Sequence, residues 1–494
     1  MDSFFKKAKI LSQNLNEWNR NSKIMIIGHR DGDGISATCV LLQGLKKLGF
    51  HKIIPYILLS PDLDILGSLL NEQSPKYVIT CDIGSEFTQI LKENVLDFII
   101  TDHHPNKSGI YGQKQLNCIE FGLDDETDAS GSITAFVLLM HLFDGSFWET
   151  EIGQVMLAYA ISGAISDFQF QKKIGIINEK ILNMAEINGA VKVSKDIFLF
   201  GRGLYPVHIA LNRSGIPGFL DEHFCYHIVA RYIKTKEEEN GNGNWRRIID
   251  LNTDEKQKLV DIIINRISNV SNKVDIMKFL KKEVIGQTYD LEALRGWDCT
   301  LTSDGRYSLD PREILHKINY CCRLGHWDLA LNLLNNKKVD INILNEVEEL
   351  HKLGDQEVAE ALEAYNNGIL PIQSKYEGRL VLIDFTDYIF YDEVGVVAGV
   401  IMKRNKDIEI ILSSCQSDKD GNYKVSVRAR EKIWEMIDSD MEFADAKKVY
   451  EKTELETGAD IKYGGHRFAM SGYMPKKVIP TLFKNMSNYY KTLI

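Results

Sequence analysis

Residues 99–105 read Ile-Ile-Thr-Asp-His-His-Pro, and the apolar run that begins at Leu96 ends there in Asp102, His103 and His104. Buried parallel strands are short apolar runs of this kind, and open α/β sheets place their ligand sites just past the carboxyl ends of such strands. An acid and two imidazoles packed together at that position need a cation or an anionic ligand between them. This stretch therefore predicts a strand that ends in a functional site.

Two other apolar runs, at residues 25–28 and 77–81, end in the same way. The acids and the histidine that follow them are His29, Asp31, Asp33 and Asp82. Helical patterns at 35–48 and 63–70 separate these runs from one another and from a further apolar run at 53–59. This alternation predicts an α/β fold with a doubly wound parallel sheet, in which the carboxyl ends of the strands meet along one edge.

A fourth element completes the candidate site. The apolar, small-residue-rich run at 155–165 predicts a tightly packed helix that delivers Asp167. The candidate ligands are four carboxylates and two imidazoles, with no thiolate: Asp31, Asp33, Asp82, Asp167, His29 and His103. Such a set suits Mn²⁺ or Mg²⁺ better than structural Zn²⁺. Because six ligands exceed the need of one ion, we expect two divalent ions, with Mn²⁺ preferred, in a two-metal hydrolase site.

These residues resemble the four motifs of the DHH phosphoesterase superfamily, namely His29-x-Asp-x-Asp, Asp82, Asp102-His-His and Asp167. The run Gly-Gly-His-Arg-Phe-Ala-Met-Ser-Gly at 464–472 resembles the glycine-glycine-histidine motif of the DHH-associated domain. That pairing is typical of the nuclease and phosphodiesterase branch. Within this branch, segments at 200–217 and 319–331 are similar to archaeal RecJ-like single-strand nucleases, including the GINS-associated type.

The resemblance implies a role for each motif residue. One ion would be held by His29, Asp31 and Asp82, and the other by Asp33, Asp82, His103 and Asp167, so that Asp82 bridges the two. Asp102 would orient a ligand histidine, and His104 would contact the scissile phosphate and stabilise its developing charge. The substrate's other phosphates would be bound by residues of the C-terminal domain: Ser426, Arg428, Gly464, Gly465, His466 and Arg467.

Composition and resemblance together predict the domain organisation. We expect a DHH catalytic domain at 1–195, a mostly helical middle region at 196–368 that is suited to binding a partner, a linker at 369–378 and a smaller α/β DHH-associated domain at 379–494. In the last domain, the patterns predict strands at 379–383, 395–402, 408–413 and 423–428, and helices at 430–438 and 445–457. Residues 464–477 are expected to form a phosphate-binding loop.

Charge and cysteine content limit the partners and the compartment. The net charge of −10 argues mildly against a nucleic-acid binder. However, no acid follows Asp460, and the segment after it interleaves lysines with aromatic residues, a combination that suits single-stranded nucleic acid. For residues 478–490, an ordinary amphipathic helix with its lysines in solvent is an equal alternative. The eight cysteines show no Cys-x-x-Cys spacing and lie in apolar patterns, as reduced core residues do. No apolar run has the length of a membrane span. We expect a cytoplasmic protein that does not bind membranes.

Taken together, these features predict a metal-dependent exonuclease that hydrolyses single-stranded DNA or RNA in replication or repair. The 5′→3′ polarity and a protein partner such as GINS or another replication or repair protein are implied by the resemblance alone. One alternative is a catalytically silent scaffold subunit of a replication or repair complex. The other is a phosphodiesterase for oligoribonucleotides or cyclic dinucleotides. The complete ligand set favours the nuclease over the scaffold, which has no reason to keep six metal ligands.

Overall fold

The computed structural model describes residues 1–494 except 107–108, 172, 217, 220, 237–243, 271–274, 390–392, 418–420, 431–445, 467–468 and 493–494. The chain divides into two compact units, Met1–Glu348 and Glu349–Ile494. The finer division into domains at 1–195, 196–368 and 379–494 stays a prediction. Among the described residues, no helix combines the length and the apolar character that crossing a membrane requires.

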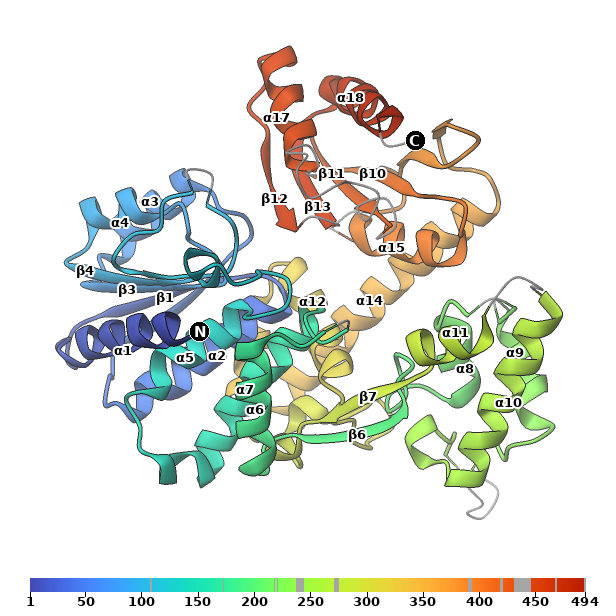
Figure 1. Cartoon of the computed structure of the whole chain (residues 1–494), viewed down its shortest axis with the longest axis horizontal. Coiled ribbons are helices and arrows are strands. Elements are labelled where there is room, and N and C mark those ends of the chain that lie inside the picture. The colour runs from blue at the N-terminus through green and yellow to red at the C-terminus, as the bar shows by residue number, and fades with distance from the viewer. Residues whose placement is uncertain are drawn as a thin grey trace. The chain divides into compact units, whose positions relative to one another are not determined.

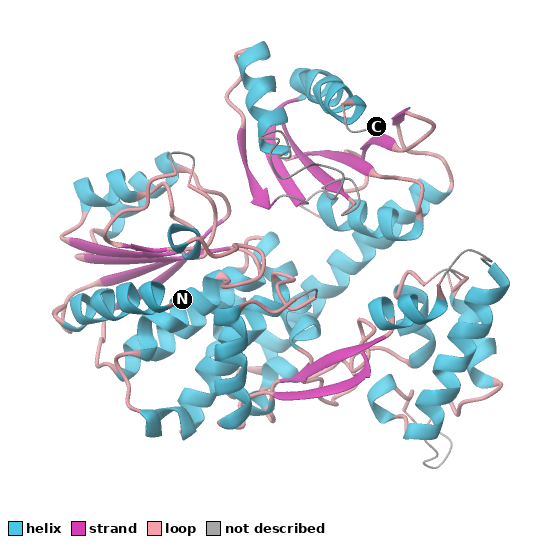
Figure 2. Cartoon of the chain, in the orientation of Figure 1, coloured by secondary structure: helices cyan, strands magenta, loops and turns pink. Residues whose placement is uncertain are grey.

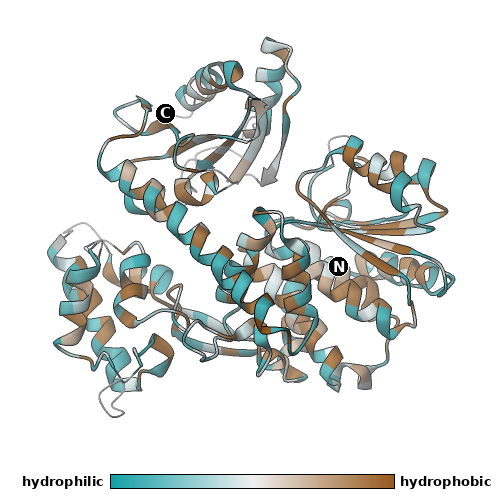
Figure 3. Ribbon diagram, turned by 180° about the vertical axis from the view of Figure 1, so that it is seen from behind, coloured by the Kyte–Doolittle hydropathy of each residue, from teal (hydrophilic) through white to brown (hydrophobic). Residues whose placement is uncertain are grey.

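The first unit is built on a parallel sheet with the strand order β2-β1-β3-β4-β5 (Figure 1). Its strands are β1 (Ile24–His29), β2 (Ile53–Leu58), β3 (Tyr77–Cys81), β4 (Asp97–Thr101) and β5 (Gln115–Leu116). The central strands β1, β3 and β4 are buried along almost their whole length, which is why their sequences are continuously apolar. Figure 3 shows the same strands in the colour of hydrophobic residues.

Helices cover both faces of this sheet, which confirms the predicted doubly wound α/β fold (Figure 1). One face carries α3 (Leu63–Gln73) and α4 (Thr88–Asn94), and the other carries α1 (Asp2–Asn16), α2 (Gly32–Lys47) and α5 (Gly131–Met140). The helix α6 (Glu151–Ser166) packs against α2 and α5 and ends at Asp167, as predicted, and α7 (Ile176–Ile187) follows it. All eight cysteines are free and buried, also as predicted.

The middle of the chain is mostly helical, as expected. An antiparallel ribbon of β6 (Lys192–Ile197) and β7 (Ile285–Asp290) carries a lobe of helices (Figure 2). These helices are α8 (Val207–Arg213), α9 (Glu222–Ala230), α10 (Thr253–Val270) and α11 (Ile276–Glu283). The lobe has a hydrophobic core of its own, which includes Leu211, Phe219 and Ile263. The helices α12 (Pro311–Arg323) and α13 (Trp327–Asn335) then return to α2, and α14 (Ile341–Asn366) contains the boundary between the units.

The second unit is a six-stranded sheet with the order β12-β13-β11-β10-β9-β8. Its strands are β8 (Ile372–Lys375), β9 (Leu380–Asp384), β10 (Ile410–Gln416), β11 (Asn422–Ala429), β12 (Lys462–His466) and β13 (Ala469–Pro475). Its described helices after α14 are α15 (Val394–Arg404), α17 (Ala446–Thr457) and α18 (Ile479–Lys491). The α17 and α18 helices pack on one face of the sheet, and α15 and the end of α14 pack on the other.

Three predictions for this unit differ from what the structure contains. The predicted strand at 395–402 is wrong, because the segment forms α15: its buried residues Val394, Val397, Ala398 and Ile401 recur with the helical spacing of three and four. The predicted loop at 464–477 contains the paired strands β12 and β13. The predicted linker at 369–378 contains β8. The predicted helix at 430–438 lies, apart from its first residue, outside the described residues.

Candidate metal centre

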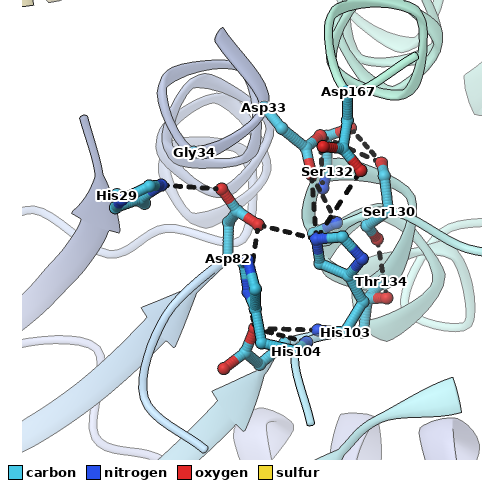
Figure 4. A network of polar contacts seen from close by, with 12 residues as sticks. His29, Asp33, Gly34, Asp82, His103, His104, Ser130, Ser132, Thr134 and Asp167 are labelled. Atoms are coloured by element: carbon cyan, nitrogen blue, oxygen red, sulfur yellow. Dashed lines mark hydrogen bonds and ion pairs between the residues drawn. The ribbon is translucent and has the colours of Figure 1, made fainter. Parts of the chain in front are cut away.

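The predicted ligands come from four neighbouring points of the fold. The strands β1, β3 and β4 are adjacent and in register, with Gly28 beside Cys81 and Cys81 beside Thr101. The next residues of these strands, and the first turn of α2, therefore reach the same edge of the sheet. Asp167 arrives there from the end of α6 (Figure 4). The structure brings all six predicted ligands into one cluster, along with Asp102 and His104.

The first group of ligand atoms belongs to His29, Asp31 and Asp82. The Nδ1 atom of His29 lies 2.8 Å from Oδ2 of Asp31 and 3.5 Å from Oδ2 of Asp82. Burial acts to lower the pKa of His29, but the two carboxylates outweigh it and raise that pKa to about 10. Burial acts to raise the pKa of Asp31, but His29 holds it well below its usual value. Without a metal ion, a proton therefore supplies the positive charge in this group.

The second group consists of Asp33, His103 and Asp167, with Asp82 alongside. The Nε2 atom of His103 lies 3.2 Å from Oδ1 of Asp82, 3.8 Å from Oδ2 of Asp167 and 4.0 Å from Oδ2 of Asp33. The other ring nitrogen, Nδ1, lies 2.9 Å from the carbonyl oxygen of Asp125, which can only accept a hydrogen bond. This contact fixes Nδ1 as the donor and leaves Nε2 to face three carboxylates, which is the tautomer that a metal-binding histidine needs.

Asp82 lies between the two groups, with His29 on one side and His103 on the other (Figure 4). Its backbone is left-handed, with φ of +59°, a conformation that costs a residue with a Cβ atom free energy and that occurs at functional sites. Both of its carboxylate oxygens are buried, and neither accepts a well-aligned hydrogen bond from a described residue. A buried carboxylate in this state needs a cation, so the residues present fit divalent metal ions.

Asp33 is held by a group of residues that the sequence reasoning missed, at the beginning of α5. Its carboxylate accepts hydrogen bonds from the Ser130 hydroxyl at 2.9 Å and from the backbone amides of Gly131 at 2.6 Å and Ser132 at 3.1 Å. The positive end of a helix dipole favours an anion there. Burial and the charges of Asp82 and Asp167 nevertheless raise the pKa of Asp33 well above its usual value. A divalent ion beside these carboxylates would reverse that shift.

Gly131 is required at this point because α5 approaches Asp82 very closely. A Cβ atom added to Gly131 would lie 2.3 Å from Cβ and 2.7 Å from Cα of Asp82. Ser130 caps α5 with its side chain, so the Ser-Gly-Ser sequence before an apolar run does identify a helix start. The pattern does not, however, predict that the beginning of this helix binds the carboxylate of Asp33.

Asp102 and His104 form a pair next to the ligands. The Nδ1 atom of His104 lies 2.9 Å from Oδ1 of Asp102 and 3.9 Å from Oδ1 of Asp82. Asp102 also accepts hydrogen bonds from the backbone amides of Ser85, His103 and His104. Burial acts to raise the pKa of Asp102, but the charges of the two histidines and the hydrogen bonds from the ring and the backbone amide of His104 lower it. Asp102 is therefore an anion that fixes the ring of His104.

Gln169 is a further residue that the sequence reasoning missed. Its side-chain amide donates to Oδ2 of Asp167 and to the carbonyl oxygen of Asp125, both at 2.9 Å, and it accepts from Asn178 at 2.7 Å. It thereby holds one ligand carboxylate and the carbonyl group that orients His103. Only its proximity to Asp167 in the sequence could have pointed to it.

The predicted substrate-binding residues lie in the second unit. Ser426 pairs across the sheet with Ser471, which pairs with Gly464, while Arg428 pairs with Ala469, which pairs with His466. The guanidinium of Arg428 donates to Oγ of Ser426 at 2.7 Å, and a Cβ atom on Gly395, in the first turn of α15, would lie 2.5 Å from it. Gly465 pairs with Met470 in the same hairpin. Arg467 lies outside the described residues. The structure thus places the other five residues on β11 and β12, the two strands that flank β13.

Comparison with known proteins agrees with this architecture. Residues 23–163 match the DHH family, N-terminal domain. The single-stranded-DNA-specific exonuclease RecJ of Bacillus subtilis (strain 168) is 35% identical over 116 residues, which cover 20% of this chain and 14% of that protein. The chain therefore matches only a small part of this relative.

Several solved structures match almost the whole chain. RecJ of Thermus thermophilus in complex with Mn²⁺ has a TM-score of 0.53 at 17% identity, over 99% of this chain and 55% of that one. Cdc45 of Entamoeba histolytica has a TM-score of 0.57 at 10% identity, over 98% of both chains. At these identities the likeness is one of fold. Residues 23–163 therefore match a DHH-family domain, and the chain as a whole has a RecJ-like fold.

Proposed function

We propose that the protein is a phosphodiesterase that uses two divalent metal ions and hydrolyses single-stranded nucleic acid from an end. One ion would be held by His29, Asp31 and Asp82, and the other by Asp82, Asp33, His103 and Asp167. The proposal rests on the position of Asp82: its two carboxylate oxygens are buried, and each faces a different group of candidate ligand atoms. A carboxylate placed in this way can be shared by the two ions of a two-metal centre.

The ions supply polarisation of the phosphate and a water of lowered pKa. The residues of the chain position the scissile phosphate and the carboxylates that would hold the ions. His104 is proposed to bind the scissile phosphate and stabilise its developing charge, because its Nδ1–H faces the Asp102 anion and its Nε2 is thereby turned to the other side of the ring. Ser130, Ser132 and Gln169 keep the carboxylates of Asp33 and Asp167 in place before the substrate arrives.

Manganese is the preferred ion in this proposal. Two imidazoles among the ligands favour Mn²⁺ over Mg²⁺, which binds oxygen ligands almost exclusively. RecJ structures with either Mn²⁺ or Mg²⁺ support both ions as candidates.

The substrate is proposed from the second unit and from the RecJ relative. A guanidinium beside the N-terminus of a helix, as at Arg428 and α15, is suited to a phosphate. The similarity to a single-stranded-DNA-specific exonuclease, RecJ, supports an extended single strand as the substrate, and the 5′→3′ polarity is taken from the likeness to RecJ. Comparing the hydrolysis of one sequence as single-stranded DNA and as single-stranded RNA distinguishes these two substrates.

The test is hydrolysis of one labelled sequence as single-stranded DNA, single-stranded RNA and blunt duplex DNA, with Mn²⁺ or Mg²⁺, alongside a cyclic dinucleotide. We expect mononucleotides from the single strands and resistance of the duplex. Asp82→Ala should abolish hydrolysis and weaken binding of Mn²⁺, because both ions lose a ligand. The matched control is Asp62→Ala, which removes a helix-capping carboxylate that follows β2 and belongs to neither ligand group. Normal turnover by Asp82→Ala, or a cyclic dinucleotide as the best substrate, would contradict the proposal.

A second, compatible role is binding to a replication or repair protein, such as GINS. Two observations favour it: the match to Cdc45 extends over 98% of both chains, and the helical lobe on the β6–β7 ribbon has its own core and contributes none of the described metal ligands. Co-elution of the full-length chain with purified GINS in size-exclusion chromatography tests this role. Elution of the two proteins as separate peaks at micromolar concentration would argue against GINS as the partner.

A further inference from the structure

Phe168, the residue after the candidate ligand Asp167, has a backbone conformation that does not suit it. Its φ is +61°, in the left-handed region, at the position where helices usually carry glycine. The chain turns there at the end of α6: the amide of Phe168 donates to the carbonyl of Ile165, and that of Gln169 donates to Ala164. Glycine would make the same turn without the steric cost that a Cβ atom brings.

Burial does not compensate for this cost. The side chain of Phe168 is 68% exposed, so it gains little from the hydrophobic effect in the folded chain. Its neighbours, in contrast, are fixed: Gln169 is 1% exposed and holds the carboxylate of Asp167 through a hydrogen bond of 2.9 Å. A large aromatic ring is thus presented to solvent on a rigid turn, one residue from the metal centre. Folding alone would favour a glycine at this position.

We propose that the ring of Phe168 is a stacking surface for a nucleobase of the substrate. The inference rests on the proposed nuclease function and deepens it. Metal ions and phosphate-binding residues recognise only the phosphates of a nucleic acid, and polyphosphates and non-nucleotide phosphodiesters carry similar groups. An exposed aromatic ring on the residue next to a candidate metal ligand would add an attraction for any base, without preference for sequence, and would so select nucleotides among phosphodiesters. Strain retained next to a reactive centre is expected when the strained side chain has this kind of role.

Three substitutions separate the contributions of the ring, the bulk and the backbone. Phe168→Gly should raise KM for a single-stranded oligonucleotide by at least about fivefold, at the weaker end of base–aromatic stacking, and should raise Tm by about 1–2 °C because the left-handed turn suits glycine. Phe168→Leu keeps the bulk and the strain but has no ring, so it should raise KM without raising Tm. Phe168→Trp should keep KM near that of the wild type. Tyr232→Ala, which removes an exposed aromatic ring from the helical lobe, is the control and should leave KM unchanged.

The substrate supplies the decisive comparison. On an oligonucleotide whose terminal nucleotides are abasic, the wild-type protein and Phe168→Gly should have the same KM, because no base is present to stack. If Phe168→Gly raised KM equally on normal and abasic substrates, or on neither, the inference would be overturned even though single strands are still hydrolysed. If the wild-type protein hydrolyses no single strand, the proposed function itself fails.

A binding measurement tests the stacking without hydrolysis. In EDTA, oligo(dT) should quench the fluorescence of Phe168→Trp beyond the change seen for the six native tryptophans of the wild-type protein, and the abasic oligomer should not. Equal quenching by the two oligomers, or none by either, would contradict the proposal.

Discussion

Gly131→Ala sets two effects against each other at the metal centre. Gly131 is the first residue of α5, and alanine in a helix is normally more stable than glycine by about 1 kcal/mol. The new Cβ atom would, however, lie 2.3 Å from Cβ of Asp82, whereas carbon atoms in contact are at least about 3.5 Å apart. Because Asp82 presents its Cα and Cβ atoms there rather than the end of a flexible side chain, α5 and Asp82 must move apart by about 1.2 Å.

The clash outweighs the gain in helix propensity. Overpacking of this kind costs about 1–3 kcal/mol, so the net change in the free energy of unfolding is a loss of up to about 2 kcal/mol. The effect on hydrolysis is larger, since a displacement of about 1 Å in a reactive site can cost about 100-fold in rate. We therefore expect a folded protein that binds Mn²⁺ weakly and hydrolyses single-stranded DNA at about 1% of the wild-type rate or less.

The assay combines turnover of a labelled oligonucleotide, equilibrium dialysis with Mn²⁺ and thermal unfolding. Gly67→Ala is the matched control, because Gly67 lies within α3 and its added Cβ atom would meet only Cδ1 of Ile90, at 3.4 Å. That variant should keep its turnover and be as stable as the wild type or slightly more so. Wild-type turnover and Mn²⁺ binding by Gly131→Ala would refute the reasoning that the approach of α5 positions Asp82.

Two further predictions concern residues away from the ligands. Burial and the negative charge of Asp310 raise the pKa of Glu313 to about 7. Between about pH 4.5 and 7 the native state therefore keeps a proton on Glu313 that the unfolded chain has released. Stability should therefore fall by up to about 3 kcal/mol as pH rises from about 4.5 to 7, and Glu313→Gln should flatten that part of the denaturation profile; an unchanged slope would contradict it. Arg428→Ala should raise KM for oligonucleotides about tenfold or more and reduce the salt dependence of binding by one phosphate contact, with Mn²⁺ content unchanged. Loss of Mn²⁺ in that variant would show that Arg428 has another role.

The arrangement of the ligands was predictable because it follows from the sheet. Each of the runs before His29, Asp82 and Asp102 is short, continuously apolar and followed at once by polar residues, and parallel strands bring such ends together whatever the details of packing. Asp167 was predictable for a related reason: the small residues of α6 allow the close helix packing that places its end at the sheet.

The supporting residues were not predictable, because their roles depend on which helix lies against which strand. Ser130 reads as a helix cap in the sequence, and only the packed structure shows that the same helix start binds Asp33. The helix α15 was mistaken for a strand because its valines favour strands, whereas its burial repeats with the helical period. In α15, the preference of valine for strands was outweighed by the packing of one helix face against the sheet.

Charge balance gives an independent reason to expect two ions rather than one. Asp31, Asp33, Asp82 and Asp167 together carry four negative charges when ionised, and His29 and His103 carry none when they act as ligands. One divalent ion would leave two uncompensated negative charges in a largely buried group, which is costly, while two divalent ions balance the set. In the metal-free protein the raised pKa values of Asp33, His29 and His103 serve the same purpose with protons. Metal binding at the proposed centre would therefore release protons, and measuring that release would count the protons that the ions replace.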